Sequence, residues 1–267
     1  MVKVVILGST GMLGNAVSSV FDNGDFDVKK SYRKKEFSKD KNMFHFDALT
    51  SSLDKIPDCD YLINCIGIIK PYMLNDIQKN IYVNSIFPHE LSRWCKSKHI
   101  KMIHITTDCV FSGETGFYHE DSVHDCLDEY GKSKSLGEPK DCMVLRTSII
   151  GKEIHSFSSL VSWVISQKEK EISGFTNHLW NGMTTKEYGV CCKKIINQDL
   201  YKTGLYHLHS NDITKFELVS MINKKYDLNI KINKKVVEKS CNRTLRTKHE
   251  LNERLEIPNL KVQIGDM

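Results

Sequence analysis

Apolar positions at the start of the chain form a short strand pattern that leads straight into a helical one. Residues 2–7 are mostly apolar and β-branched, which is typical of a buried strand, and the string GSTGMLG follows them. Ala16, Val17 and Val20 then recur at helical spacing, which predicts a helix over 15–21. The pattern therefore predicts a strand, a glycine turn and a helix in immediate succession.

The same alternation of strand and helix patterns continues along the chain. It predicts further strands at 26–32, 43–47, 61–66, 101–106 and 205–209, an extended segment at 230–237, and helices at 74–98, 215–226 and 248–255. We expect Pro88 to kink or restart the first of these helices, and Pro258 to end the last helix of the chain. Strands that alternate with helices indicate an α/β fold with a Rossmann-type doubly wound parallel sheet, and the length leaves room for a smaller C-terminal α/β lobe.

Each glycine in the first turn has a physical role. Gly8 permits a tight turn, Gly11 lets a pyrophosphate approach the backbone, and Gly14 lets the helix pack closely on the strand. The positive end of the helix that follows is a site for an anion. The spacing is GxxGxxG, which differs from the commonest dinucleotide fingerprint, and no Gly-Lys-Ser/Thr of an NTPase loop follows. Directly after a buried strand, this spacing predicts a dinucleotide site in preference to a plain glycine loop.

Charge and composition narrow the classes of function. The 267 residues include 38 Lys and Arg and 33 Asp and Glu, for a net charge of +5, and the lysines are scattered without an arginine-rich or aromatic-interleaved stripe. Nucleic-acid binding is therefore not indicated, whereas a mildly positive field favours a diphosphate-bearing substrate. No apolar run approaches the length of a membrane span and no signal-peptide pattern precedes the first strand, so we expect no membrane partner and a cytoplasmic location.

Cysteine and histidine positions indicate neither a disulfide framework nor a metal site. The nine cysteines are odd in number and dispersed, with no CxxC and no Cys/His cluster at zinc spacing. We expect them to be reduced, and we expect no bound metal ion. His207 and His209 share one face of a predicted strand, where a structural role is expected in preference to metal binding.

Residues beyond the second predicted strand indicate which dinucleotide binds. A cofactor without a 2′-phosphate usually meets an Asp or Glu there, about twenty residues after the glycines, but this chain has Arg33, Lys34 and Lys35. The basic cluster favours NADPH, with Arg33 as its contact to the extra phosphate, while NADH stays open and a solvated loop is the alternative. Asp47, at the end of the third predicted strand, is placed to meet the adenine end of the cofactor.

Two short segments supply the candidate catalytic groups, which are hydroxyls, a carboxylate, a phenol and an ammonium. Thr106, Thr107 and Asp108 stand where the fifth predicted strand leaves the sheet, at the edge where ligands bind in parallel sheets. Tyr130 and Lys134 are spaced so that a helix places them on one face, one turn apart. The Lys134 ammonium lowers the cost of a phenolate, so Tyr130 can give a proton to an oxygen that gains negative charge.

The chain resembles the dTDP-4-dehydrorhamnose reductase family of the extended short-chain dehydrogenase/reductase superfamily, and the similarity runs over nearly its whole length. Five strings carry the resemblance: GSTGMLG, INCIGI, TTDCVF, YGKSK and LRTSIIG. The resemblance implies that Thr107, Tyr130 and Lys134 form the catalytic triad, with the last two also touching the cofactor. The other cofactor contacts that it implies lie in the glycine turn, after the fourth predicted strand and near the nicotinamide: Gly8, Thr10, Gly11, Met12, Leu13, Gly14, Asn64, Cys65, Ile66, Gly67, Asn84, Thr106, Thr147 and Ser148.

The same resemblance divides the chain into two functional parts. Residues 1–150 would form an NADPH-binding Rossmann domain, and 151–267 mainly a sugar-nucleotide lobe, with 184–200 returning to the Rossmann domain. Candidate substrate contacts are Thr107, Asp108, Cys109, Asn177, Trp180, Gly182, Thr184 and Arg243. An arginine suits a diphosphate because its guanidinium can bond two oxygens at once. The implied activity is NADPH-dependent reduction of the C4 keto group of a dTDP- or UDP-linked 4-keto-6-deoxyhexose, in deoxysugar nucleotide biosynthesis.

Departures from the family pattern leave alternatives open. Ile149 and Ile150 follow Ser148 where an aromatic residue is common, and Cys109 stands where a tyrosine is frequent. Reduction of a UDP-2-acetamido-2,6-dideoxy-hexos-4-ulose fits these residues as well, so the nucleobase and the sugar stay open. A non-catalytic NADP-binding subunit, like the methionine adenosyltransferase β subunit, is disfavoured by the complete triad, and an NAD-holding epimerase or dehydratase by the Arg33 cluster. A homodimer is compatible with the resemblance.

Overall fold

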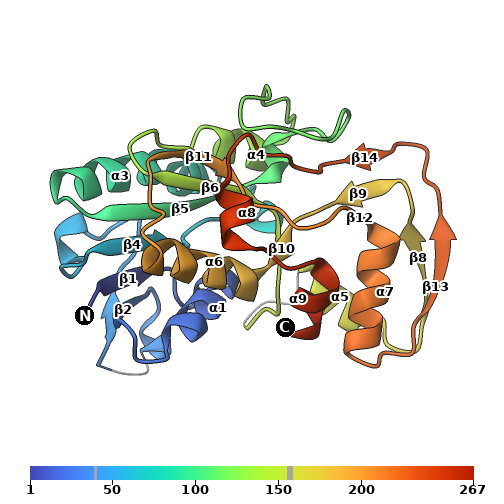
Figure 1. Cartoon of the computed structure of the whole chain (residues 1–267), viewed down its shortest axis with the longest axis horizontal. Helices are drawn as coiled ribbons and strands as arrows, with labels where there is room; N and C mark the ends of the chain where they lie inside the picture. The colour runs from blue at the N-terminus through green and yellow to red at the C-terminus, as the bar shows by residue number, and fades with distance from the viewer. Residues whose placement is uncertain (39–40, 155–158) are drawn as a thin grey trace.

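Seven parallel strands form the central sheet of the computed structural model, which describes residues 1–38, 41–154 and 159–267 (Figure 1). Every neighbouring pair in the order β11-β6-β5-β4-β1-β2-β3 is parallel. The strands are β1 (Lys3–Leu7), β2 (Asp27–Tyr32), β3 (Met43–His45), β4 (Tyr61–Asn64), β5 (Lys101–Thr107), β6 (Met143–Thr147) and β11 (Gly204–His207). The strand order runs in opposite directions from β1 and β4, so the sheet is doubly wound, as the sequence predicts.

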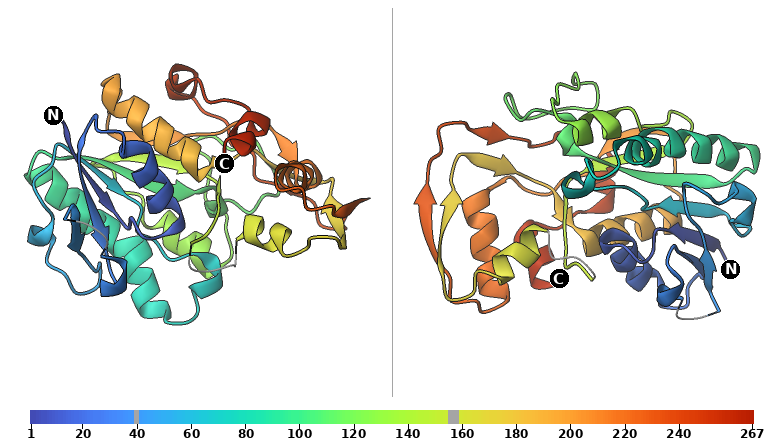
Figure 2. Two further views of the ribbon diagram at one scale, coloured as in Figure 1. Left: turned by 90° about the horizontal axis from the view of Figure 1, so that it is seen from below. Right: turned by 180° about the vertical axis from the view of Figure 1, so that it is seen from behind.

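Helices cover both faces of this sheet (Figure 2). α1 (Met12–Phe21) and α6 (Thr185–Asn197) pack against each other on one face. α3 (Phe87–Ser97) covers the other face and buries its own apolar side there. The sheet is therefore the middle layer of three, and its strands are buried on both sides.

The apolar run of β1 shows why this strand lies at the centre. Val4 and Ile6 belong to the core that contains α1 and α6, whereas Val5 and Leu7 belong to the core that contains α3. Successive side chains of a strand point to opposite faces, so a strand between two layers needs apolar residues at every position. β1 meets this requirement, and it places the glycine turn in the middle of the sheet's carboxyl edge.

The helical region predicted at 74–98 is interrupted. It contains α2 (Ile77–Ile81), then a π-helical segment (Tyr82–Ile86), and then α3. Pro88 lies in the first turn of α3, where its missing N–H costs no helical hydrogen bond. The sequence predicts that Pro88 kinks or restarts the helix, and the structure has a change from π-helix to α-helix directly before it, without a break in the helical backbone.

The C-terminal part folds around a core of its own. Its strands and helices are β8 (Glu171–Phe175), β9 (His178–Trp180), β12 (Ile213–Thr214), β13 (Lys231–Lys235), β14 (Cys241–Asn242), α5 (Leu160–Ile165), α7 (Lys215–Lys225) and α9 (Leu260–Gly265). β13 pairs with β8, and β9 lies between β12 and β14. Val161, Trp180, Leu218 and Leu260 share the core. A smaller α/β unit beside the large sheet confirms the predicted fold class.

One segment crosses back from this unit to the large sheet. β10 (Met183–Thr184) pairs with β7 (Ile149–Ile150) and leads directly into α6. α6 lies close to α1, since a Cβ on Gly189 would stand only 3.1 Å from the Val17 Cα. The two helices form one layer although they are far apart in the sequence.

The end of the chain differs from the prediction. The helix expected at 248–255 is shorter, α8 (Leu251–Leu255), and it ends where Glu256 takes a left-handed backbone conformation with φ 49°. It is not the last helix, because Asn259 caps α9 with its side chain. The prediction used Pro258 as a stop signal and missed the cap that directly follows it.

All nine cysteines lie in the described part of the chain and are free thiols. Within the same residues, no group of three or more His, Cys, Asp or Glu side chains is gathered as metal ligands would be. The described helices also include none that is both long and apolar enough to cross a membrane.

Candidate active site

The turn between β1 and α1 presents backbone N–H groups. Gly8 has φ +77°, which residues with side chains rarely adopt, and its N–H donates to Ser31 Oγ at 2.8 Å. A Cβ on Gly14 would lie 2.1 Å from the Gly8 carbonyl oxygen, so glycine is needed for α1 to pack this closely. Gly11 begins α1 without a side-chain cap among the described residues. A first helical turn that lacks a side-chain acceptor suits a phosphate group.

Two adjoining cavities form one groove along the carboxyl edge of the sheet. The larger, of about 370 Å³, runs from the glycine turn to Arg33 and Asp47, and the smaller, of about 170 Å³, reaches Tyr130 and Lys134. Both cavities are lined by Gly11, Cys65, Ile66, Gly67 and Ile68. Further predicted residues that line one or the other are Gly8, Thr10, Met12, Leu13, Thr106, Thr107 and Thr147. The groove lies where the strand order reverses, which is the usual ligand position in such sheets.

Four predicted cofactor residues are absent from the described lining of the two cavities: Gly14, Asn64, Asn84 and Ser148. Asn64 is fully buried, and its Nδ2 lies 3.1 Å from His104 Nδ1. Its Oδ1 accepts the Ile66 N–H at 3.1 Å. Asn64 therefore shapes the wall of the groove from behind.

Asn84 connects the groove wall to the helix that carries Tyr130. Its Oδ1 accepts the Ile68 N–H at 2.8 Å, and its Nδ2 donates to the Ile68 carbonyl oxygen at 2.9 Å. The same Nδ2 lies 3.1 Å from Ser133 Oγ, one residue before Lys134. The amide is thus fully engaged, and its place in the structure is that of a positioning residue.

The three predicted catalytic side chains meet in the smaller cavity. Tyr130 and Lys134 lie one turn apart on α4 (Glu129–Ser135), as the YGKSK spacing predicts. Asp128 caps this helix by accepting a backbone N–H of its first turn at 2.8 Å. Thr107 ends β5, and its side chain lines the same cavity as Tyr130.

Burial shifts the acidity of both groups on α4. It raises the pKa of the Tyr130 phenol above its usual value, although the nearby Thr107 hydroxyl opposes the rise. It lowers the pKa of Lys134 to about 8, in a side chain that is 5% exposed. The Lys134 ammonium donates to the Ile105 carbonyl oxygen at 3.2 Å. A lysine with this pKa is largely protonated at neutral pH, so a phenol and an ammonium group face the same cavity.

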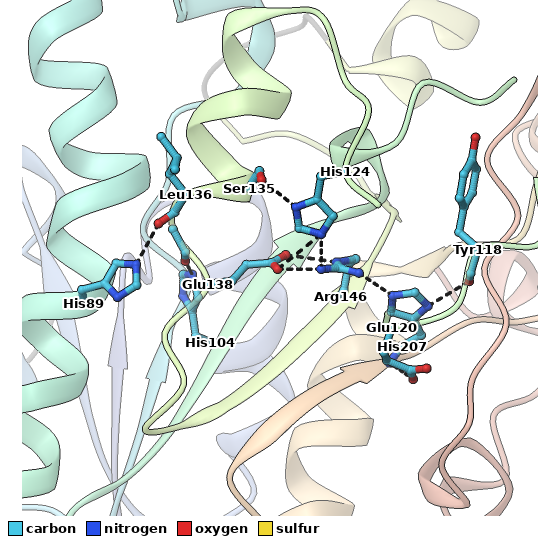
Figure 3. A network of polar contacts seen from close by, with 11 residues as sticks. His89, His104, Tyr118, Glu120, His124, Ser135, Leu136, Glu138, Arg146 and His207 are labelled. Atoms are coloured by element: carbon cyan, nitrogen blue, oxygen red, sulfur yellow. Dashed lines mark hydrogen bonds and ion pairs between the residues drawn. The ribbon is translucent and has the colours of Figure 1, made fainter. Parts of the chain in front are cut away.

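A buried arginine holds the end of α4 (Figure 3). Arg146, on β6, binds the two carboxylate oxygens of Glu138 with Nε at 3.0 Å and Nη2 at 2.6 Å. Its Nη2 also donates to His124 Nε2 at 2.6 Å, and its Nη1 to His207 Nε2 at 2.8 Å. His124 Nδ1 lies 2.6 Å from the Ser135 hydroxyl of α4. The network joins four separate segments of the chain, and the sequence analysis did not predict it.

The same contacts fix the protonation of both imidazoles. Because Arg146 has N–H donors alone, His124 and His207 accept with Nε2 and carry their proton on Nδ1. Burial, followed by the nearby Arg146 charge, lowers the pKa of both, that of His207 to about 4. β11 ends at His207, so His209 lies beyond the strand and the prediction that the two histidines share its face is wrong. His207 is a structural residue, as expected.

Charged groups from the C-terminal part face the carboxyl of Asp108. Asp108 follows Thr107 and is 3% exposed, and burial raises its pKa while Arg243 and Lys215 oppose the rise. Arg243 Nη1 lies 3.7 Å from Cys109 Sγ. The Arg243 Nε is buried and has no hydrogen-bond partner among the described residues. A guanidinium with an unused donor is available to a ligand.

Lys215 is a candidate substrate contact that the sequence analysis did not predict. Its Nζ lies 4.9 Å from the centroid of the Trp180 ring. Burial lowers its pKa, and the nearby Asp108 carboxylate opposes this effect. A signal was present in the sequence, since Thr214 and Glu217 form a capping box that fixes the start of α7 and thereby the place of Lys215.

The other predicted substrate residues are engaged within the protein. Asn177 pairs through both amide atoms with the backbone of Val237, at 2.7 Å and 3.1 Å. Thr184 caps α6 with its side chain. A Cβ on Gly182 would lie 2.4 Å from the Trp180 ring, so a larger residue at this position would clash with the ring. Of the residues predicted in this part, Trp180 lies beside Lys215, and Arg243 lies near both Asp108 and Lys215.

A dinucleotide-sized groove at the switch point, closed at one end by a tyrosine and a lysine on one helix, defines a class of protein: the extended short-chain dehydrogenase/reductases. Within this class the family is shown by a direct match. Residues 2–250 match the family model described as the RmlD substrate binding domain, and the chain belongs to that family.

Three individual proteins match this chain at sequence identities between 19% and 31%. A Haloferax volcanii protein named as a probable low-salt glycan biosynthesis reductase, Agl14, is 31% identical over 180 residues, and the match spans 60% of this chain and 59% of that protein. Methionine adenosyltransferase 2 subunit beta of Danio rerio is 25% identical over 246 residues, which cover 85% of this chain and 74% of that protein. Among solved structures, dTDP-4-dehydrorhamnose reductase from Bacillus anthracis in complex with NADP superposes with a TM-score of 0.81 at 19% identity, over 99% of this chain and 98% of that one.

Proposed function

We propose that this protein is an oxidoreductase that uses NADPH to reduce the C4 keto group of a nucleotide-diphosphate-linked 4-keto-6-deoxyhexose, of the dTDP- or UDP-4-dehydrorhamnose type, in deoxysugar nucleotide biosynthesis. The observation that carries the proposal is that Thr107, Tyr130 and Lys134 meet at one end of a groove whose other end is lined by Arg33. Membership of the RmlD family and the relative named as a glycan biosynthesis reductase support the same class of reaction.

The groove fits a nicotinamide dinucleotide in its polar groups. The glycine turn suits the pyrophosphate, and Arg33 and Asp47 line the part proposed for the adenosine end. Thr106 Oγ1, in the smaller cavity, is buried and has no hydrogen-bond partner among the described residues, so it can serve a ligand. When bound, the nicotinamide supplies the hydride. We favour NADPH over NADH because the Arg33 guanidinium suits a 2′-phosphate, and the similar structure that contains NADP supports this choice.

The side chains of the smaller cavity supply the proton chemistry. Tyr130 gives its proton to the ketone oxygen as that oxygen gains negative charge, and Thr107 holds the oxygen beside the phenol. The Lys134 ammonium stabilises the phenolate that remains. Binding of the remote nucleotide diphosphate provides the energy that positions the ketone.

The sugar nucleotide is proposed to bind between this cavity and the C-terminal part. In this division, 1–150 with 184–200 hold the cofactor, and the remainder of 151–267 mainly holds the substrate. Arg243 and Lys215 supply positive charge on that side, next to Asp108. A diphosphate on the substrate needs such charge, and the guanidinium can bind two of its oxygens.

A second candidate follows from the similarity to methionine adenosyltransferase 2 subunit beta, which covers 85% of this chain. On this reading the protein binds the dinucleotide and acts as a regulatory subunit. The arrangement of Thr107, Tyr130 and Lys134 argues against it, because binding alone does not require a phenol, a hydroxyl and an ammonium in one cavity.

Incubation with NADPH and a panel of sugar nucleotides tests the two candidates. The panel contains dTDP- and UDP-linked 4-keto-6-deoxyhexoses and a UDP-2-acetamido-2,6-dideoxy-hexos-4-ulose. Loss of NADPH absorbance with one of them, followed by NMR of the product, identifies the nucleobase, the sugar and the stereochemistry at C4. NADPH binding without oxidation by any member of the panel would favour the regulatory candidate.

Tyr130→Phe tests the role of Tyr130 as proton donor in the proposed reductase. It removes the proton donor and keeps the ring, so NADPH binding should remain while turnover falls by about two orders of magnitude or more. Turnover close to that of the wild type would remove Tyr130 from its proposed role.

A further inference from the structure

One face of α2 and of the π-helical segment after it forms a wall of the larger cavity. Four residues at helical spacing line the cavity from this face: Asp76, Lys79, Asn80 and Val83. Arg33 and the glycine turn line the same cavity from other segments. A ligand in the cavity therefore meets α2 as well as the segments that the sequence analysis predicted as cofactor contacts.

Asn80 is a buried polar residue of this wall with an unused acceptor. It is 8% exposed, and its Nδ2 donates to the backbone carbonyl oxygens of Tyr72 and Met73 at 2.8 Å and 2.9 Å. These two contacts fix the amide, whereas its Oδ1 accepts no hydrogen bond from the residues that the structure describes. Buried polar groups normally have partners, so this wall suits a polar ligand.

Lys79 carries a positive charge that Asp76 holds at the exposed edge of the cavity. Its Nζ lies 2.6 Å from Asp76 Oδ2, and its backbone N–H donates to Asp76 Oδ1 at 3.3 Å. The side chains of Lys79 and Asp76 are 65% and 43% exposed, so water screens their attraction and the pair contributes little to stability. An anionic ligand can therefore take the ammonium from Asp76 at a small cost.

The charges that line the larger cavity cancel in the free protein. The described lining contains two cations, Arg33 and Lys79, and two carboxylates, Asp47 and Asp76. NADPH brings a pyrophosphate and a 2′-phosphate, each with about two negative charges. One guanidinium does not balance this charge, so the lysine in the same lining is the second cation that such a ligand needs.

We propose that Lys79 binds a phosphate of the dinucleotide, and that Asp76 holds the ammonium in the free protein and competes for it. The inference rests on the proposed cofactor site and deepens it, because it adds a cation that neither the glycine turn nor Arg33 provides. Lys79 contacts the cofactor, whereas Asp76 acts through Lys79 and is a positioning residue. The two partners of one ion pair therefore have opposite effects: loss of Lys79 weakens binding, and loss of the Asp76 charge strengthens it.

Fluorescence titration with NADPH, without any sugar substrate, tests the role of Lys79. Lys79→Met keeps most of the apolar stem and removes the charge, so the Kd should rise about tenfold at low ionic strength and less at high ionic strength. Lys79→Arg keeps the charge and should bind within about twofold of the wild type.

Lys96→Met is the matched control. Lys96 pairs with Asp141 at the same distance of 2.6 Å and is 66% exposed, but it lies outside the described lining of the cavity. Its replacement should leave the Kd for NADPH almost unchanged. A Kd for Lys79→Met equal to that of Lys96→Met would overturn the proposal.

Titration of Lys79→Met with NADH identifies the phosphate. The two dinucleotides share the pyrophosphate, and NADPH alone has the 2′-phosphate. A Kd that rises for both assigns Lys79 to the pyrophosphate, whereas a Kd that rises for NADPH alone assigns it to the 2′-phosphate together with Arg33.

Asp76→Asn tests the competition for the ammonium. Asparagine can still accept the Lys79 backbone N–H, which keeps the start of α2, but it has no charge that holds the ammonium. The Kd for NADPH should fall about two- to fivefold, because an exposed ion pair no longer has to break. Asp141→Asn, which changes the carboxylate of the control pair, should leave the Kd unchanged. An Asp76→Asn variant that bound NADPH no better than Asp141→Asn would contradict the competition.

Thermal unfolding without cofactor separates binding from folding. Lys79→Met and Asp76→Asn should unfold within about 3 °C of the wild type, because an exposed pair contributes little to stability. A wild type that bound no dinucleotide would contradict the proposed function. A wild type that bound NADPH through Lys79 but reduced no 4-keto sugar would contradict the reductase and leave the role of Lys79 supported.

Discussion

The Arg146 guanidinium binds both carboxylate oxygens of Glu138 inside the protein, at 3.0 Å and 2.6 Å. The Arg146 side chain is 0% exposed and that of Glu138 is 11% exposed. Glu138 closely follows α4, and Arg146 lies on β6, so the pair fixes the end of the helix that carries Tyr130 and Lys134 (Figure 3). The helix that carries Tyr130 and Lys134 is thereby held from two sides, by this pair and by Asn84.

Glu138→Gln should destabilise the protein strongly. The substitution keeps the size of the side chain but leaves the Arg146 charge buried without a counter-charge. Loss of one partner of a buried ion pair costs about 3–5 kcal/mol. Urea unfolding at pH 7 measures the change in the free energy of unfolding.

A surface pair provides the matched control for this prediction. Lys96 and Asp141 lie 2.6 Å apart, with side chains that are 66% and 46% exposed. Exposed pairs contribute about 0–1 kcal/mol, so Asp141→Asn should change the unfolding free energy by no more than about that amount. Equal effects of Glu138→Gln and Asp141→Asn would show that the Arg146 charge is compensated in some other way.

Stability should fall as the pH drops from about 6.5 toward 4. The pKa of His207 is lowered from 6.5 to about 4 by burial and by Arg146, with Glu120 acting in the opposite sense. Between these pH values the unfolded chain binds a proton that the folded protein excludes. The stability that depends on a neutral His207 is therefore fully present above about pH 6.5 and is lost as the pH falls toward 4. The slope is at most about 1.4 kcal/mol per pH unit for this imidazole, and His124, whose pKa is also lowered, adds to it.

Urea unfolding across this pH range, with His207→Gln beside the wild type, checks the prediction. The glutamine offers Arg146 an oxygen in place of Nε2 and cannot titrate, so the variant should have a flatter dependence of stability on pH. A wild-type stability that is constant between these pH values, or a variant with an undiminished slope, would contradict the assignment of a neutral His207.

The parts of the site that were predictable from the sequence are those whose chemistry is local. The glycine turn works through backbone conformation within seven residues, and Tyr130 and Lys134 share a face because of helix geometry alone. Pro88 lies in the first turn of α3 for an equally local reason. Such features need no knowledge of the rest of the fold, and together with the alternation of strand and helix patterns they predicted a doubly wound parallel sheet with its groove at the carboxyl edge.

The parts that were not predictable depend on several distant segments. Arg146 is one of six arginines in the sequence. Only the folded chain brings His124 from before α4, Glu138 from after it and His207 from β11 to its guanidinium. The family resemblance implies cofactor contacts for Asn64 and Asn84, yet their amides bind protein groups behind the wall of the groove. A motif therefore predicts which segments of the chain lie at the site. Which side chains point into the site depends on the packing of distant segments.

Arg33→Ser should weaken binding of NADPH and leave binding of NADH almost unchanged. Arg33 is exposed in the free protein and lines the larger cavity, so its proposed partner is the 2′-phosphate that NADH lacks. Loss of a charge-assisted contact of about 1.5–3 kcal/mol corresponds to a Kd for NADPH that rises about tenfold or more. Fluorescence titration with both dinucleotides measures the effect.

Lys34→Ala is the control for Arg33, because Lys34 carries the same charge on the next residue and is directed to Glu36 at 3.7 Å. A general loss of positive field would weaken NADPH binding equally in both variants, at low ionic strength most of all. A specific contact predicts a large effect of Arg33→Ser and a small one of Lys34→Ala. Equal effects would remove Arg33 from the phosphate site.

Gly14→Ala should abolish dinucleotide binding. The added Cβ would stand 2.1 Å from the Gly8 carbonyl oxygen and 2.6 Å from its carbon, both backbone atoms that cannot turn away, so α1 must move off β1. Gly265→Ala is the control, because its Cβ would meet no described atom within 4 Å at the end of α9, and alanine there should leave binding intact. NADPH titration and thermal unfolding of both variants measure the outcome. If Gly14→Ala bound NADPH like the wild type, the phosphates would have to rest somewhere other than the first turn of α1.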